Sequence, residues 1–181
     1  MLHVDLAGRP LNANADLTPF LGEAAVVKIR NPAWEDVPGA PAKKIFRISK
    51  SALLGAIREA TGSEAVPARL LVSCDPMPLD ASGNHDPDHI LVLDYEAAAF
   101  VGAEPQFRLY GTSWISSDFE PGSRERPVHK SLLRNGYIFE MLDLANVASG
   151  VYFMVALPIP LIGASEAPVC PVLFAPGELP G

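Results

Sequence analysis

The feature that most constrains the fold is the even spread of 18 prolines and 14 glycines through the 181 residues. Proline removes a backbone N–H donor and glycine adds conformational freedom, so both residues interrupt regular structure. Short apolar runs stand between these interruptions. The pattern predicts short strands joined by irregular loops, and it disfavours a helical bundle or a collagen-like repeat.

The apolar runs and their flanking residues predict an α/β order of elements in a single domain, residues 1–181, built on a mixed sheet. Each of three predicted helices has an N-terminal signal and a glycine at its end. They are bounded by Ser49 and Gly62, by Asp94 and Gly102, and by Pro127 and Gly136. The predicted strands are 24–30, 68–73, 89–93, 107–110, 113–115, 137–139, 151–157 and 169–174, with loops over 31–44, 75–88 and 119–127.

Composition restricts the partners and the compartment. Apolar residues make up 49% of the chain, which predicts a packed globule, and the net charge of −7 disfavours nucleic acid and anionic membranes as partners. No apolar run is long enough to span a membrane, and the first residues lack a secretory signal, so we expect a cytoplasmic protein. Cys74 and Cys170 lie in apolar stretches and are predicted to be buried, reduced thiols.

Residues 129–140 place a histidine and a carboxylate at the two ends of a predicted helix-turn-strand unit. Glu140 interrupts the apolar run 137–142, where a carboxylate is costly unless it is paired. His129 lies in the first turn of its helix, where the helix dipole disfavours a cation, so we expect a neutral ring near pH 7. We take His129 as a candidate general base and Glu140 as a proton shuttle or a partner of His129. The alternative is that both are ordinary surface residues.

Two other polar segments are weaker candidates. His85 and His89, with the carboxylates between them, offer possible metal ligands, but Pro87 prevents a helix that would align the histidines. We interpret this segment as a solvated loop. Residues 124–126 are also interpreted as a solvated loop, with gripping of a substrate carboxylate as the alternative.

Seven segments carry a resemblance to a known family. They are residues 20–29, 48–53, 69–73, 111–118, 129–140, 156–158 and 167–169. In their order and spacing the chain resembles the metal-dependent cyclase-like hydrolases, the group that includes bacterial kynurenine formamidase and isatin hydrolase. The resemblance implies a swivelling β/β/α fold, a homodimer or homotetramer, and zinc or manganese near a histidine cluster. In such a site the metal lowers the pKa of a bound water and polarises a carbonyl, so that a formamide or lactam is hydrolysed.

The chain departs from this family at its N-terminal end. The family's metal motif has the form His-x-Gly-Thr-His-x-Asp-x-Pro-x-His. In one alignment, His3 and Asp5 take the positions of the second histidine and the aspartate, and Arg9 replaces the last histidine. In the other, residues 1–11 correspond to the family's first strand and the motif is missing.

The C-terminal segments depart less. His129 and Glu140 are one residue closer than is usual in the family, so a change of strand register would turn Glu140 to the other face. Ser113 stands where the family often has an aspartate.

Two hypotheses follow. In the first, the chain is a divergent hydrolase that cleaves a C–N bond of a small amide, formamide or lactam. Its metal would be held by His3 and Asp5, and its protons moved by His129 and Glu140. In the second, it is a metal-free descendant of the family with a binding, assembly or non-hydrolytic role.

Overall fold

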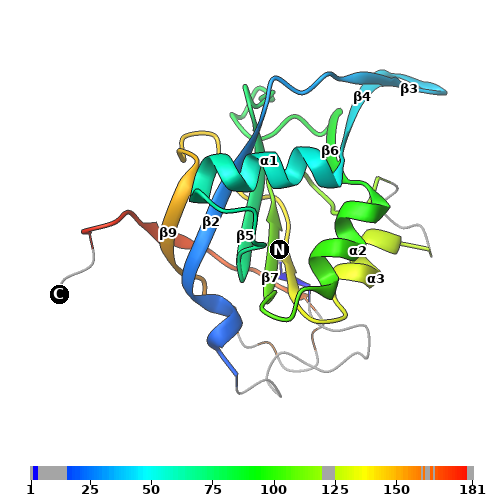
Figure 1. Cartoon of the computed structure of the whole chain (residues 1–181). Coiled ribbons are helices and arrows are strands. Elements are labelled where there is room, and N and C mark those ends of the chain that lie inside the picture. The colour runs from blue at the N-terminus through cyan, green and yellow to red at the C-terminus, as the bar shows by residue number, and fades with distance from the viewer. Residues whose placement is uncertain are drawn as a thin grey trace.

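The structure, a computed structural model, describes residues 2–3, 16–119, 125–159, 161, 164 and 166–178. In these residues the chain forms an eight-stranded mixed sheet, a three-stranded sheet and three α-helices (Figure 1). The strand orders are β10-β1-β8-β7-β5-β2-β9-β11 and β3-β4-β6. This architecture confirms the predicted α/β class with a mixed sheet.

The elements have the following bounds. The strands of the larger sheet are β1 (Leu2–His3), β2 (Leu21–Arg30), β5 (Arg69–Asp75), β7 (Leu109–Thr112), β8 (Tyr137–Phe139), β9 (Gly150–Val155), β10 (Glu166–Ala167) and β11 (Val172–Phe174). Those of the smaller sheet are β3 (Glu35–Val37), β4 (Ala40–Ile48) and β6 (His89–Leu93). The helices are α1 (Lys50–Thr61), α2 (Tyr95–Ala103) and α3 (Pro127–Leu132), with a 3₁₀ turn, η2 (Thr18–Phe20), before β2.

The middle of the larger sheet is parallel. β2, β5, β7 and β8 run in one direction, and antiparallel strands flank them on both sides. Leu70, Leu71 and Val72 of β5 are fully buried, as expected for a parallel strand that is covered on both faces. Because these strands are parallel, the loops after β5, β7 and β8 leave the sheet at the same edge.

The three α-helices cover one face of this sheet (Figure 1). Ile57 of α1, Val101 of α2 and Leu132 of α3 belong to one hydrophobic cluster that also contains side chains of the strands. A second cluster lies on the opposite face and includes Phe139 and Met154. The sheet therefore separates two cores.

α1 forms where the sequence predicts it. The Ser49 hydroxyl accepts the backbone N–H of Ala52, and Gly62 ends the helix in the left-handed conformation. Gly102, in contrast, was predicted to end α2 but lies inside that helix. A Cβ at this position would lie 2.2 Å from the carbonyl oxygen of Ser131 in α3. The glycine thus permits the close approach of two helices.

Several other predictions from local sequence are wrong. The predicted loop 31–44 contains β3 and the start of β4, which form a hairpin that projects from the body (Figure 1). The predicted strand 113–115 is a bend after β7. Cys74 is buried as predicted, but Cys170 is exposed. Local sequence does not decide which of these segments pair, because strand pairing depends on tertiary contacts.

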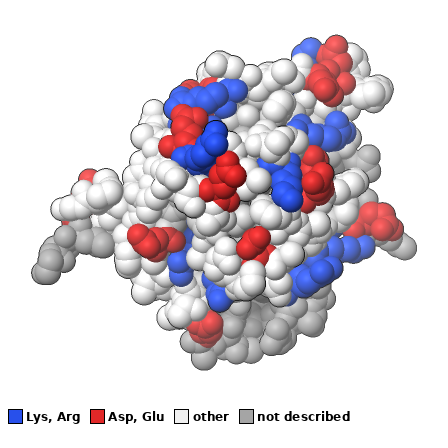
Figure 2. Space-filling model, in the orientation of Figure 1, with Lys and Arg blue, Asp and Glu red and all other residues white. Residues whose placement is uncertain are grey.

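Two observations describe the surface. Basic and acidic side chains are interspersed on the face shown in Figure 2. Among the described residues, no helix is both long and apolar enough to cross a membrane.

Candidate active site

Three buried ionisable side chains meet at the carboxyl edge of the parallel strands. Asp118 follows β7, His129 lies in α3, and Glu140 directly follows β8. The Nδ1 atom of His129 lies 2.6 Å from Oδ2 of Asp118, and its Nε2 atom lies 3.3 Å from Oε1 of Glu140. The relative exposures are 4% for Asp118, 2% for His129 and 1% for Glu140. Ligand sites in open α/β sheets commonly lie at this edge.

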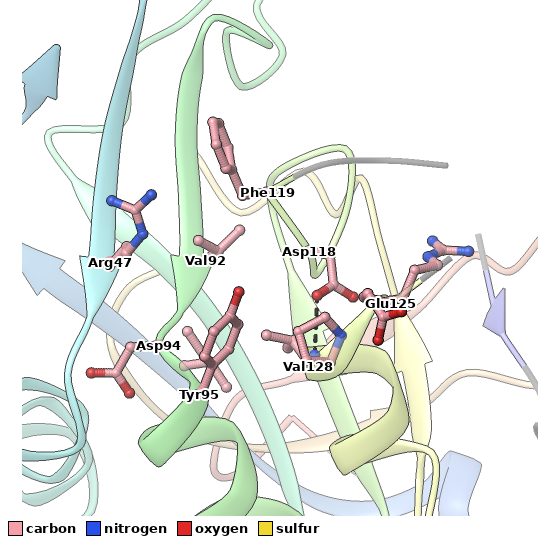
Figure 3. Close-up of a pocket in the computed structure, with 11 residues that line it drawn as sticks. Arg47, Val92, Asp94, Tyr95, Asp118, Phe119, Glu125 and Val128 are labelled. Carbon is pink, nitrogen blue, oxygen red and sulfur yellow. Dashed lines mark hydrogen bonds between the residues drawn. The ribbon is translucent and has the colours of Figure 1, made fainter. Parts of the chain in front are cut away.

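Asp118 positions both the helix and the imidazole. The N-cap residue of α3, Arg126, makes no side-chain cap of its own. Asp118 accepts the free backbone N–H groups of Val128 (3.0 Å) and His129 (3.1 Å) instead (Figure 3 shows Asp118 facing Val128). The same carboxylate accepts Nδ1–H of His129, which fixes the ring orientation.

Glu140 faces His129. The spacing of these residues left open whether Glu140 would turn to the other side of the sheet, and the structure places it on the side of the imidazole. The backbone N–H of Ser117 donates to its Oε1 atom. Met141, the next residue, has a φ of 61°, a left-handed conformation uncommon outside glycine. The chain therefore bends sharply directly after Glu140.

The pKa of His129 shifts in the direction opposite to the sequence-based expectation. Burial lowers the pKa of His129, but its hydrogen bonds with Asp118 and Glu140 outweigh burial and raise it above the usual value. Burial raises the pKa of Asp118, but hydrogen bonds from His129 and Val128 outweigh this and lower it. The expectation that the helix end disfavours the charged ring is wrong in direction, because Asp118 offsets the positive end of α3.

Arg126 also contacts the imidazole of His129. Its Nη2 atom donates to Nε2 of His129 over 3.0 Å. A neutral ring can accept this bond, whereas a protonated ring would donate from Nε2 to Glu140. Arg126 can therefore hydrogen-bond the neutral form of His129, and Glu140 can hydrogen-bond the protonated form.

A cavity of about 350 Å³ adjoins this group. Asp118, Glu125 and Val128 lie on one side of it, while Arg47 of β4 and Tyr95 of α2 lie on the other (Figure 3). Arg126 also lines the cavity. Glu140 borders a second, mainly apolar cavity of about 490 Å³. The first cavity thus gives access to Asp118 and Arg126 and the second to Glu140, while His129 lines neither.

The residues expected to hold a metal are only partly described. His3 lies in β1, opposite Ile138 of β8 and so close in register to Glu140, whereas Asp5 lies outside the described residues. Within the described ranges, no three His, Cys, Asp or Glu side chains are grouped to hold a metal ion. Nδ1 of His129 is bonded to Asp118, and a guanidinium lies at Nε2. A second cation is electrostatically disfavoured there, so these residues do not fit a divalent metal.

The histidine-containing loop has a structural role. The Ser113 hydroxyl and Nδ1 of His85 lie 2.7 Å apart, and Nε2 of His85 lies 2.9 Å from the backbone oxygen of His89. His85 is buried, so the prediction of a solvated loop is wrong at this residue. Because both ring nitrogens are bonded within the protein, His85 anchors the loop and does not offer a metal ligand.

Sequence reasoning identified His129 and Glu140 but did not identify Asp118 or the role of Arg126. A signal for Asp118 was present. The predicted helix begins Arg126-Pro127-Val128, with no Ser, Thr, Asp or Asn at its start, so its cap had to come from elsewhere in the chain.

Comparisons with known proteins agree with the fold. No family model and no curated protein matches the chain by sequence. A solved structure described as a potential metal-dependent hydrolase with cyclase activity is 21% identical, with a TM-score of 0.65 over 95% of this chain and 74% of that chain. A predicted metal-dependent hydrolase from Bacillus stearothermophilus is 22% identical, with a TM-score of 0.63 over 95% and 75%. Isatin hydrolase A from Labrenzia aggregata is 16% identical, with a TM-score of 0.62 over 96% and 71%.

These likenesses confirm, at the level of the fold, the resemblance to cyclase-like hydrolases. Two of these neighbours are described as metal-dependent.

Proposed function

We propose that this protein is a hydrolase that cleaves the C–N bond of a small amide, formamide or lactam. The observation that carries the proposal is the chain of contacts from Asp118 through His129 to Glu140, buried at the carboxyl edge of the parallel strands. The hydrolase fold of the structural neighbours supports the reaction class, although fold alone does not establish function.

In this proposal His129 is the general acid and base. Asp118 holds Nδ1–H and so leaves Nε2 as the basic nitrogen. Nε2 takes a proton from the attacking water and later gives it to the departing nitrogen. Glu140, 3.3 Å from Nε2, stabilises the imidazolium between these two transfers. Burial excludes bulk water and strengthens these charge interactions.

Zinc or manganese, held by His3 and Asp5, is the cofactor that the sequence resemblance implies. No step above passes through a metal, because the described residues around His129 do not fit one. The remaining parts of the proposal are a small-molecule substrate, a homodimer or homotetramer, and a cytoplasmic location. Light scattering and cell fractionation test the last two.

The test is turnover of N-formyl aromatic amines and cyclic amides by the purified chain. His129→Ala is expected to lower kcat by on the order of 10²–10⁴ while leaving the circular dichroism spectrum unchanged. Glu140→Gln removes the negative charge beside Nε2 and is expected to lower kcat, whereas Glu35→Gln, which alters an exposed carboxylate of β3, is expected to leave turnover unchanged.

Equal turnover by the wild type and His129→Ala contradicts the assigned role of this histidine. A folded wild type that cleaves none of these compounds favours the alternative, a binding or assembly role.

A further inference from the structure

We propose that Arg126 is a catalytic residue whose guanidinium binds the oxygen of the scissile carbonyl and stabilises the negative charge that develops there. In this role Arg126 supplies the positive charge that a metal ion would otherwise supply, so turnover needs no divalent metal. The inference rests on the proposed hydrolase function and extends it.

The first observation is the position of the guanidinium. Nη2 of Arg126 lies 3.0 Å from Nε2 of His129, the nitrogen assigned to proton transfer. A carbonyl group attacked by a water at Nε2 must lie beside this nitrogen, within reach of the same guanidinium. The adjoining cavity, which Arg126 and Asp118 both line, gives a small substrate access to the guanidinium.

The second observation is an unused donor. The Nε atom of Arg126 is buried and has no hydrogen-bond partner among the described residues. A buried donor without an acceptor destabilises the fold, so its retention indicates that an acceptor binds during function. A guanidinium offers two parallel N–H groups to an oxygen or a carboxylate, a geometry well suited to an oxyanion.

The third observation is the backbone of Arg126. Its φ of 31° lies in the left-handed region, which is strained for a residue with a Cβ and is enriched at functional sites. Pro127 and the bonds from Asp118 to the first turn of α3 fix the next residues, so the strained conformation is held in place.

The backbone N–H donors around His129 are already used. Oxyanions are commonly bound by backbone N–H groups. Here those of Val128 and His129 donate to Asp118, and that of Ser117 donates to Glu140. Arg47 lies on the opposite side of the cavity, over the ring of Phe119 at 5.5 Å (Figure 3). Among these groups, Arg126 is the cationic one that contacts Nε2 of His129 and has a buried donor without a described partner; the Ser117 hydroxyl is a second, neutral donor of this kind.

The reaction that follows is balanced. Nε2 of His129 takes a proton from water as the water oxygen bonds to the carbonyl carbon, and the carbonyl π electrons move to its oxygen. Nε2 has a single lone pair and cannot accept from Arg126 and from the water together, so the guanidinium moves from Nε2 to the carbonyl oxygen when the water binds and then holds the oxyanion. The carbonyl then re-forms, the C–N bond breaks, and the departing nitrogen takes the proton from Nε2, giving a carboxylic acid and an amine.

Arg126→Gly tests the role without adding backbone strain, since glycine tolerates the positive φ. We expect kcat to fall by on the order of 10²–10³ with little change in KM, and added guanidinium ion to restore part of it. Guanidinium should not restore His129→Ala. Arg134→Gly, which removes an exposed guanidinium just after α3, is the matched control and should retain wild-type kcat.

Two further measurements separate catalysis from a structural role. Because Arg126 lowers the pKa of His129, its removal should shift the acidic limb of the kcat/KM profile to higher pH. Arg126→Lys, which keeps the charge, should retain more activity than Arg126→Gly. Wild-type turnover should persist after prolonged dialysis against a chelator.

The outcomes distinguish this inference from the proposed function. If wild type is active but Arg126→Gly has an unchanged kcat, the inference fails and the hydrolase function stands. The same holds if chelation abolishes wild-type turnover and zinc or manganese restores it. If wild type cleaves no amide, the proposed function itself fails.

Discussion

At the scale of single residues, one imidazole is shared by groups of opposite charge. Asp118 accepts from one ring nitrogen, while the other lies 3.0 Å from Arg126 and 3.3 Å from Glu140. The carboxylates favour the protonated ring and the guanidinium opposes it. A histidine balanced in this way can both accept and release a proton, which is what an acid-base catalyst requires.

Asp118→Asn is the sharpest test of this arrangement. The amide is nearly isosteric, but its NH₂ group cannot accept Nδ1–H, and it favours the wrong tautomer if it donates to Nδ1. In a comparable Ser-His-Asp triad this change lowers kcat about 10⁴-fold, and we expect a loss on the order of 10²–10⁴ here. Steady-state kinetics on a cleaved amide would check it.

Asp36→Asn provides the control, because Asp36 is an exposed carboxylate of β3. Wild-type kcat in Asp118→Asn would show that the proton is moved without help from Asp118.

At the scale of elements, α3 depends on its neighbours. A helix of six residues does not form alone in water, because the conformational entropy lost on nucleation exceeds the stabilisation from so few hydrogen bonds. Asp118 supplies its missing cap, and α2 packs closely against it at Gly102. The position of His129 therefore depends on a loop after β7 and on a second helix.

Gly102→Ala should disturb this packing. The new Cβ would lie 2.2 Å from the backbone oxygen of Ser131, so α3 must move, at a cost of about 1–3 kcal/mol or more. Urea unfolding measures the loss of stability. Because His129 moves with α3, kcat should fall as well.

Gly55→Ala is the matched control in α1, where a Cβ would meet nothing within 4 Å. This change should stabilise the protein by up to about 1 kcal/mol, since alanine is the better helix former. Equal stability of the two variants would show that the α2–α3 approach tolerates a methyl group.

The cap of α1 gives a second prediction at this scale. Ser49→Ala removes the acceptor for the N–H of Ala52 and should cost about 1 kcal/mol of unfolding free energy. Ser82→Ala, in an exposed loop, is the control and should change stability little, whereas Ser51 is unsuitable because its hydroxyl lies 3.1 Å from that of Ser49. Chemical denaturation of both variants decides whether the Ser49 hydroxyl acts as a cap.

At the scale of the whole molecule, the buried His129–Asp118 pair links folding to pH. The raised pKa of His129 stabilises the fold below about pH 6.5, and this contribution is lost as pH rises through the folded pKa. The lowered pKa of Asp118 stabilises the fold above about pH 4, and this contribution is lost as pH falls through the folded pKa. The pair should therefore stabilise the protein most between about pH 4 and 6.5.

Urea unfolding of the wild type and Asp118→Asn at about pH 5.5 and about pH 8.5 tests this link. The difference in unfolding free energy should be larger at the lower pH. His85, whose pKa is lowered by burial, shifts stability in the opposite sense, but it is common to both proteins and cancels. A difference that does not change with pH would contradict the pairing of charged His129 with Asp118.

The fold is shared with other proteins over nearly the whole chain, but a shared fold does not decide the chemistry. The chain's similarity to hydrolases and cyclase-like proteins extends over 95% or 96% of its length, at identities of 16–22%. Such a fold places loops at the carboxyl edge of the strands, but the side chains in those loops decide the chemistry. Here they bring Asp118 and Arg126 to His129.

The sequence by itself determined the features that depend on neighbouring residues. These include the caps of α1, the apolar central strands, and a helix that begins at Pro127 and leads into β8 and Glu140. Only the tertiary structure decided the contacts between distant residues. Among them are the bond of Asp118 to His129, Arg126 at Nε2, and the close approach of α2 and α3 at Gly102. The reason is physical: propensities and caps act within a turn of chain, whereas burial and charge pairing depend on which strands lie side by side.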